Sequence, residues 1–253
     1  MGIWSWGRGK KDDDIILDCY TYNVYAYNFA KINHGYHYIP EWWKKTPTIT
    51  ENSTRTIKKC PAVIEYYKKG IVLPMWCEVK IQVNPIGDKE LCRWESSQKD
   101  FQIVTHAQEQ FDGFTKNKGN NLKILSPWFI KCEEEIYFTY TQPIWSQRDT
   151  MFNLILTPGV LSFKHQMWTS LNYFIEQKDV QQNIHIEPLT PMLIMHPMSE
   201  RKIKLRHHLL TTKDRALEHP TYGMFINDQT TDHFKRKKSL FEKIDKIDRG
   251  VYK

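Results

Sequence analysis

Residues 71–83, IVLPMWCEVKIQV, decide the fold class of this chain. In their second half, Trp76, Glu78, Lys80 and Gln82 alternate with Cys77, Val79, Ile81 and Val83. Such alternation predicts a β-strand with one buried face, because successive side chains of a strand point to opposite faces. Just before it, apolar residues recur at helical spacing between Pro61 and Gly70, which predicts a short helix that ends at the glycine.

Short β-prone runs continue outward from this stretch. We expect one or two strands in 15–29 and further strands at 101–105, 122–124, 128–130, 135–141, 151–156, 159–163, 172–175, 183–186 and 192–195. Gly, Pro and Asn between them are typical of a sandwich or barrel, and no helices of 10–15 residues intervene as a doubly wound α/β fold requires. The expected fold is mainly β, with a β-sandwich or jelly-roll-like core and a few short helices, one of them beginning near Pro40.

The 253 residues divide into three expected parts. Residues 1–14 show no periodicity and read as an N-terminal arm, 15–215 as a single β-rich domain, and 216–253 as a basic C-terminal tail. The pattern turns polar and helical at Ser199, which predicts a helix running towards Leu217. Apolar residues recur near helical spacing over 232–247, so we expect the tail to contain an amphipathic helix.

Cysteine usage and hydropathy point to a reducing compartment. The five cysteines are scattered and never form C-x-x-C, so we expect free thiols rather than disulfides or a zinc site. The first residues lack the apolar core of a signal peptide, and no run approaches 18 apolar residues. We therefore expect neither secretion through a signal peptide nor a membrane span.

One pair of residues suggests a metal centre. His185 and Glu187 would lie on the same face of a strand. A third ligand, which could be His207, His208 or His219, would complete the two-histidine, one-carboxylate triad of Fe(II)/2-oxoglutarate oxygenases. Arg201 or Arg206 would then bind the carboxylate of the keto acid. The H-x-E pair arises readily by chance in a chain with ten histidines. Zinc-deaminase chemistry is excluded because P-C-x-x-C is missing. No nucleophile-elbow, Walker A or dinucleotide-binding motif exists. The sequence therefore favours a protein that is not an enzyme, with no catalytic residues and no cofactor.

The net charge of +7 and the pI near 9.0 allow a polyanionic partner. Much of the excess lies in residues 201–208 and 235–238. Sequence-independent binding of nucleic acid through these two runs is one alternative function. Solvated charged faces are the more frequent role of such runs.

Exposed aromatic side chains and the basic tail suggest contacts with other proteins. Large aromatics on a polar arm usually mark a docking surface. The expected partner-binding residues are Trp4 and Trp6 in the arm, and Lys235, Arg236, Lys237, Lys238 and Phe241 in the tail.

Several dispersed segments, most of them with Trp, Pro or Gly, form a pattern: Pro40-Glu41-Trp42-Trp43-Lys44, Thr56-Ile57-Lys58-Lys59-Cys60-Pro61, Gly70-x-x-x-Pro74-x-Trp76-x-Glu78, His106-x-x-x-Gln110, Lys123-x-x-Ser126-Pro127-Trp128, Pro143, and Ile186-x-x-Leu189-Thr190-Pro191-Met192. Together these segments resemble an uncharacterised family of β-rich tailed-phage and bacterial proteins. The resemblance covers roughly residues 15–215, although Pro188 and Leu189 depart from the family's Gly-x-Pro turn. It implies a compact β-sandwich and an accessory or virion protein, and it supplies no catalytic residues.

The function expected from these observations is that of a phage-type structural or accessory protein, which acts through protein–protein interaction in a larger assembly. Its partners would be other subunits, of a phage particle or of a homo-oligomer, and its location the host cytoplasm or the assembled virion. An Fe(II)/2-oxoglutarate oxygenase and a nucleic-acid-binding protein are the alternatives.

Overall fold

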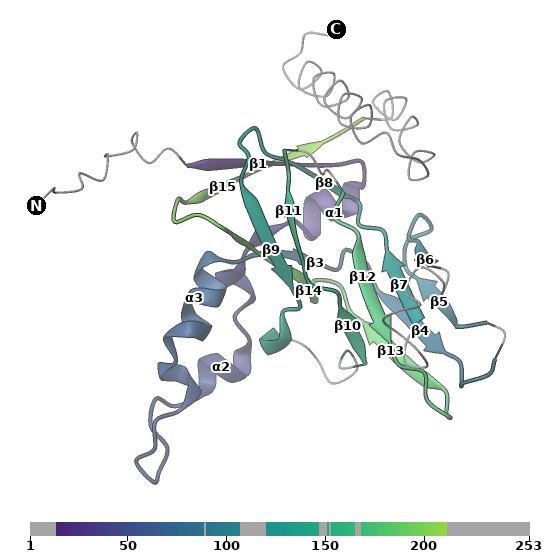
Figure 1. Ribbon diagram of the computed structural model, residues 1–253, viewed down its shortest axis with the longest axis horizontal. Coiled ribbons are helices and arrows are strands. Elements are labelled where there is room, and N and C mark those ends of the chain that lie inside the picture. Colours follow the sequence, from purple (N-terminus) through teal and green to yellow (C-terminus); the bar gives the residue numbers. More distant parts are fainter. Residues whose placement is uncertain are drawn as a thin grey trace, which may run out of the picture.

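The computed structural model describes residues 14–88, 90–106, 120–146, 151, 153–164 and 168–211. These residues fold mainly into β-strands, as the sequence predicted. Figure 1 shows the strands forming the body of the protein, with two helices set to one side of it. None of the helices in this part of the chain is long and apolar enough to cross a membrane.

The described strands form four sheets. The first has the order β15-β1-β8 (Ile203–Leu209, Ile15–Thr21, Trp128–Lys131), and the second β10-β12-β7-β6 (Leu154–Leu156, Leu171–Ile175, Asn120–Ile124, Ile103–Thr105). The third has the order β11-β9-β14-β3-β2 (Gly159–Ser162, Tyr137–Thr141, Pro191–Pro197, Ile71–Pro74, Asn33–His34), and the fourth β13-β4-β5 (Gln182–Ile186, Val79–Val83, Cys92–Ser96). Among these strands every pairing is antiparallel except that of β1 with β15.

The stretch 71–83 supplies two strands rather than one. Strand β3 ends at Pro74, and β4 begins at Val79 in a different sheet. The predicted alternation holds in β4, where Val79, Ile81 and Val83 are buried. Trp76 lies in the crossing between the strands and is buried too, although the alternation placed it on the polar side. The crossing therefore carries the chain through the core from one sheet to the next.

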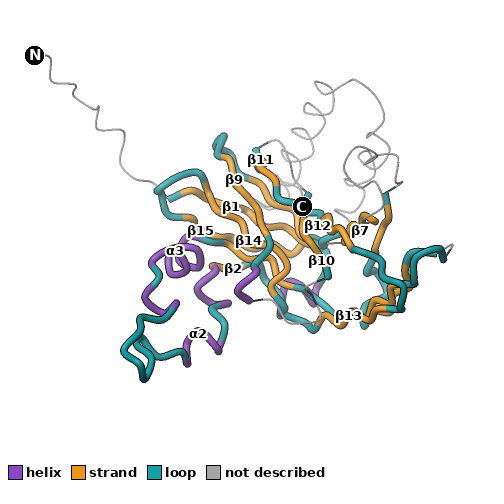
Figure 2. Tube along the Cα trace, turned by 60° about the horizontal axis from the view of Figure 1, so that its bottom comes forward, coloured by secondary structure: helices purple, strands orange, loops and turns teal. Residues whose placement is uncertain are grey.

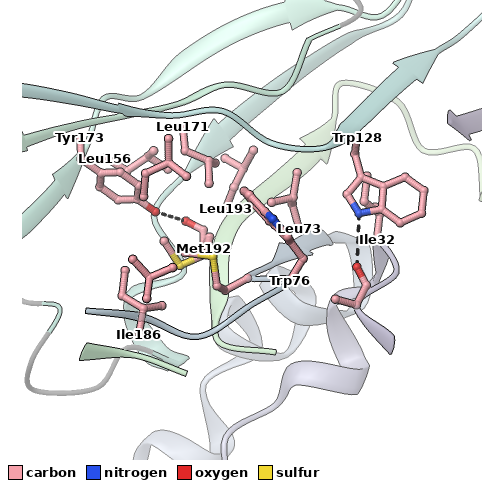
Figure 3. Packing of buried hydrophobic residues seen from close by; sticks show 14 of the residues in the cluster. Ile32, Leu73, Trp76, Trp128, Leu156, Leu171, Tyr173, Ile186, Met192 and Leu193 are labelled. Carbon is pink, nitrogen blue, oxygen red and sulfur yellow. Dashed lines mark hydrogen bonds between the residues drawn. The ribbon is translucent and has the colours of Figure 1, made fainter. Parts of the chain in front are cut away.

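A single large hydrophobic cluster contains buried side chains from all four sheets. Two hydrogen bonds satisfy polar groups inside it (Figure 3). The Tyr173 hydroxyl of β12 donates to the carbonyl oxygen of Met192 in β14 at 2.7 Å, and Trp128 Nε1 of β8 donates to the carbonyl oxygen of Ala30 at 3.3 Å. Buried polar groups cost free energy unless they are hydrogen-bonded, so these contacts allow large aromatics to link neighbouring elements in the core.

The helices predicted near Pro40 and between Pro61 and Gly70 are confirmed. Helix α2 is Glu41–Lys45 and follows Pro40, and α3 is Pro61–Lys69, with Pro61 in its first turn and Gly70 as its C-cap. Short 3-10 turns accompany them: η1 is Gly35–Tyr38, η2 is Ile57–Lys59 and η4 is Ile144–Ser146. Residues 40–70, which we call the α2–α3 arm, project from the sheets in both views (Figures 1 and 2).

Near the ends of the described chain, one prediction is right in part and one is wrong. Residues 15–29 form strand β1 and then helix α1 (Val24–Phe29), because Asn23 accepts the amide of Ala26 and starts a helix there. The helix predicted from Ser199 is instead strand β15, which pairs in parallel with β1 from Ile203 to Leu209. Tertiary pairing with a distant strand overrides the local helical pattern in this run. Leu217 lies outside the described residues.

Strand β5 was not predicted. Its three central residues, Arg93, Trp94 and Glu95, are all exposed, so the sequence lacks the alternation that marks a half-buried strand. Its pairing with β4 makes it a strand, and it lies at the edge of its sheet.

Candidate interaction surface

An exposed apolar surface lies where helix α2 meets the turn η4. Trp42 is 45% exposed, Trp145 36% and Ile144 57%. The indole rings of Trp42 and Trp145 lie 6.5 Å apart, and Trp42 Nε1 donates to the carbonyl oxygen of Trp145 at 3.0 Å. We call these three residues the tryptophan ledge. Solvent-exposed tryptophans are costly in water, and a cluster of them is typical of a protein contact surface.

Hydrogen bonds from helix α3 hold η4 in place beneath the ledge. The Tyr66 hydroxyl donates to the carbonyl oxygen of Gln142 at 3.0 Å, and the Tyr67 hydroxyl pairs with Ser146 Oγ at 2.5 Å. Ser146 Oγ also donates to the carbonyl oxygen of Tyr38 at 3.1 Å. Burial raises the pKa of both tyrosines, so they stay neutral and able to donate at physiological pH. The ledge therefore rests on a fixed base.

Lys58 fixes the other side of the ledge. Its Nζ donates to two carbonyl oxygens in the last turn of helix α2, those of Trp43 at 2.9 Å and Lys44 at 2.7 Å, and it lies 4.2 Å from the centre of a Trp43 ring. A cation at a helix C-terminus is favourable, and so is one over an indole face. A helix of only five residues gains most of its stability from such contacts.

The α2–α3 arm is basic. Residues 40–70 contain seven Lys and Arg residues and only three Glu. Lys45 and Lys59 are exposed, and Lys44 is exposed too although it pairs with Glu41 at 2.6 Å. The ledge is thus an apolar surface beside a positively charged region. Such an arrangement suits a protein surface that is itself partly apolar and acidic.

Three side chains of the predicted basic run 201–208 pair with carboxylates. Arg201 makes a two-pronged pair with Glu134, and Asp18 of β1 accepts from Arg206 at 2.5 Å and pairs with His208 Nε2 at 2.7 Å. Burial raises the pKa of Asp18, but the hydrogen bonds from His208 and Arg206 outweigh it, and the pKa lies below its ordinary value. The carboxylates of Glu134 and Asp18 therefore reduce the positive charge that Arg201 and Arg206 offer to a phosphate.

The structure does not bring the predicted metal ligands together. His185 is on β13, where its Nε2 lies 2.8 Å from Glu78, and Glu187 follows the end of that strand. His207 is on β15, in another sheet, with Nε2 2.8 Å from the carbonyl oxygen of Ile32, and burial lowers its pKa. Across the described residues, no three His, Cys, Asp or Glu side chains form a group able to hold a metal ion. His219 lies outside these residues, so a triad that uses it stays a prediction.

The five thiols are free, as predicted. Four are buried, and Cys60 is partly accessible. Burial raises the pKa of Cys77 and of Cys92 to about 11, which keeps both thiols protonated and weakly nucleophilic. These two cysteines therefore serve as small core residues.

The expected partner-binding residues lie outside the described part of the chain. They are Trp4 and Trp6 of the N-terminal segment 1–14, and Lys235, Arg236, Lys237, Lys238 and Phe241 of the C-terminal tail. Sequence reasoning missed the ledge itself. Two signals pointed to it: adjacent tryptophans on a short helix between Pro40 and Pro47, and Trp145 two residues after Pro143.

No family model matches the chain, and no curated protein matches it.

Proposed function

We propose that this chain is a structural or accessory protein of a larger assembly, and that the tryptophan ledge docks it on a partner protein. The observation that carries the proposal is the pair Trp42 and Trp145, held side by side and exposed on a fixed base. Buried tryptophans dominate the binding energy of many interfaces, and placing them rigidly beforehand lowers the entropic cost of association.

The partner surface in this proposal is apolar at its centre and acidic at its rim. The excess of Lys and Arg in the α2–α3 arm would steer such a surface towards the ledge. The pairing of Arg201 with Glu134 and of Arg206 with Asp18 lowers the charge that this run offers to phosphates, which supports protein rather than nucleic acid as the partner.

The finer parts of the proposal come from the sequence. The resemblance of residues 15–215 to tailed-phage proteins supports a virion component, located in the host cytoplasm or the assembled particle. The antiparallel pairing around one core supports a jelly-roll-like sandwich. The apolar spacing over 232–247 supports a C-terminal helix that adds a second contact with other subunits.

Co-sedimentation of the protein with assembled phage particles tests this function. The full chain should migrate with particles in a sucrose gradient, and the double variant Trp42→Ala/Ile144→Ala should stay in the soluble fractions. We expect the apparent Kd for particles to rise at least tenfold, about the effect of losing one strong contact residue. Raising the salt concentration should weaken binding of the unaltered protein.

Phe29→Ala is the matched control, because Phe29 is an exposed aromatic on helix α1, outside the ledge. This variant should co-sediment as well as the unaltered protein does. Full particle binding by the ledge variant, or no particle binding by the unaltered chain, would contradict the proposal.

A further inference from the structure

Strand β5 has an outer edge without a neighbour in the described structure. It is the last strand of the sheet β13-β4-β5 and pairs with β4 alone. The amide of Asn84 donates to the carbonyl oxygen of Leu91, and the amide of Ser97 donates to that of Glu78, one at each end of the pairing. Hydrogen-bonded pairs alternate along an antiparallel ladder, so Arg93 and Glu95 also bond to β4. The peptide groups of Cys92, Trp94 and Ser96 therefore point outward from the sheet.

The side chains of β5 are unusual for an open edge. Trp94 is 41% exposed and lies opposite Ile81 of β4, which is fully buried. The apolar face of the sheet thus runs to its edge and ends in a half-exposed tryptophan. Arg93 and Glu95 flank it on the other face. An edge with outward peptide groups and an aromatic side chain is a template for another strand.

We infer that β5 pairs antiparallel with β5 of a second copy of this chain, about a two-fold axis at Trp94. The sequence Cys92-Arg93-Trp94-Glu95-Ser96 complements itself in this arrangement. Arg93 lies opposite Glu95 of the second copy, and Glu95 opposite its Arg93. Trp94 meets its own counterpart in a hydrogen-bonded pair, so the charged residues occupy the non-hydrogen-bonded pairs, where side chains come closest.

The same operation continues the sheet across the two copies as β13-β4-β5-β5-β4-β13. It adds about six backbone hydrogen bonds, two for each hydrogen-bonded pair, and it covers both Trp94 side chains. Arg93 contacts Glu90 through Nε at 2.7 Å, but both side chains are largely exposed and the pair can rearrange at little cost. The opposite edge offers no such match, since pairing centred on Ile184 of β13 would set Asn183 against His185.

Reversal of charge tests this pairing. Analytical ultracentrifugation of the full chain should show a monomer–dimer equilibrium. Arg93→Glu should raise the dimer Kd at least tenfold, because it sets Glu against Glu in two places. The double variant Arg93→Glu/Glu95→Arg should restore the dimer, since the complementarity returns with the charges exchanged. Lys204→Glu makes the same change in charge on β15, in another sheet, and should leave the equilibrium unaltered.

A cross-link tests the register. In a Cys60→Ser background, Trp94→Cys should give a disulfide-linked dimer under mild oxidation, because a hydrogen-bonded pair places its Cα atoms about 5.5 Å apart. The background alone should give none, as the other four cysteines are buried.

Three outcomes overturn the inference: a monomer at every concentration, a dimer indifferent to Arg93→Glu, or a folded double variant that stays monomeric. Trp42→Ala/Ile144→Ala should leave the dimer intact. Failure of this pairing is therefore distinguishable from failure of the tryptophan ledge.

Discussion

At the scale of single residues, Asp18 has the most consequential contacts. Its side chain is nearly buried on β1, and its carboxylate forms hydrogen bonds with Arg206 and His208 of β15, which lie 188 and 190 residues away in the sequence. His208 also stacks on Tyr20, with ring centres 4.6 Å apart. A buried carboxylate with an arginine and a histidine as partners stabilises only the arrangement in which all three are present.

Asp18→Asn should therefore lower the free energy of unfolding by about 2 kcal/mol at pH 7, because an amide cannot satisfy Arg206 and His208 as a carboxylate does. The pKa of Asp18 is depressed in the folded protein. Its contribution is thus complete above the ordinary carboxyl range and is lost as the pH falls through the depressed value.

Urea denaturation at several pH values measures this effect. The difference between Asp18→Asn and the unaltered protein should shrink below about pH 4, where the unfolded carboxyl begins to bind its proton. A difference that stays constant down to pH 2 would show that lost packing, rather than charge, explains the variant.

At the scale of elements, helix α1 depends on its N-cap residue, Asn23. Asn23 Oδ1 accepts the amide of Ala26 at 2.8 Å, while its Nδ2 donates to Gln98 at 2.6 Å and to Asp100 at 3.2 Å. A six-residue helix has little stability of its own, so this cap and its link to the segment after β5 define where the helix begins.

Asn23→Ala should cost about 1–2 kcal/mol of unfolding free energy, since it removes both the cap and the link to Gln98. Asn23→Ser should recover part of the loss, because serine caps a helix but cannot reach Gln98. Thermal denaturation followed by circular dichroism would rank the three proteins. Equal stability of the Ala and Ser variants would contradict a capping role.

The sequence predicted elements well where the pattern is local. Helix α3 lies between Pro61 and Gly70, and both residues act through the backbone of their own segment. Strand β15 was mistaken for a helix because the acidic partner of its Arg206 and His208 is on β1. Strand β5 was missed because its only described neighbour is β4 and its side chains are largely exposed.

At the scale of the whole molecule, one core joins the four sheets. The Tyr173 hydroxyl, fully buried, links β12 of one sheet to β14 of another through the carbonyl oxygen of Met192 (Figure 3). A core shared in this way should make the described body unfold as a unit.

Tyr173→Phe should lower the stability by about 1–2 kcal/mol, because the Met192 carbonyl loses its buried donor. Because the four sheets share one core, the substitution should destabilise all of them together. Midpoints followed by far-ultraviolet circular dichroism and by tryptophan fluorescence should therefore fall by the same number of degrees. Separate shifts of the two midpoints would show that the sheets unfold independently.

The interaction surface was less predictable than the fold. The adjacent tryptophans at 42 and 43 were visible in the sequence, but nothing local shows that Trp42 meets Trp145, 103 residues further on. Contacts of this range depend on how the sheets are arranged. Only the final fold shows which of two neighbouring tryptophans faces the solvent.

The parallel pairing of β1 with β15 also bears on how the protein is made. Strand β1 is synthesised almost 190 residues before the strand that supplies the partners of Asp18. Contacts so distant in sequence form slowly, because a long loop must close before they give any stability. In the nascent chain, the sheet therefore lacks β15, and the carboxylate of Asp18 lacks Arg206 and His208, until nearly all the described residues have left the ribosome. We therefore expect the chain to be most prone to misfolding during translation, before β15 can pair with β1.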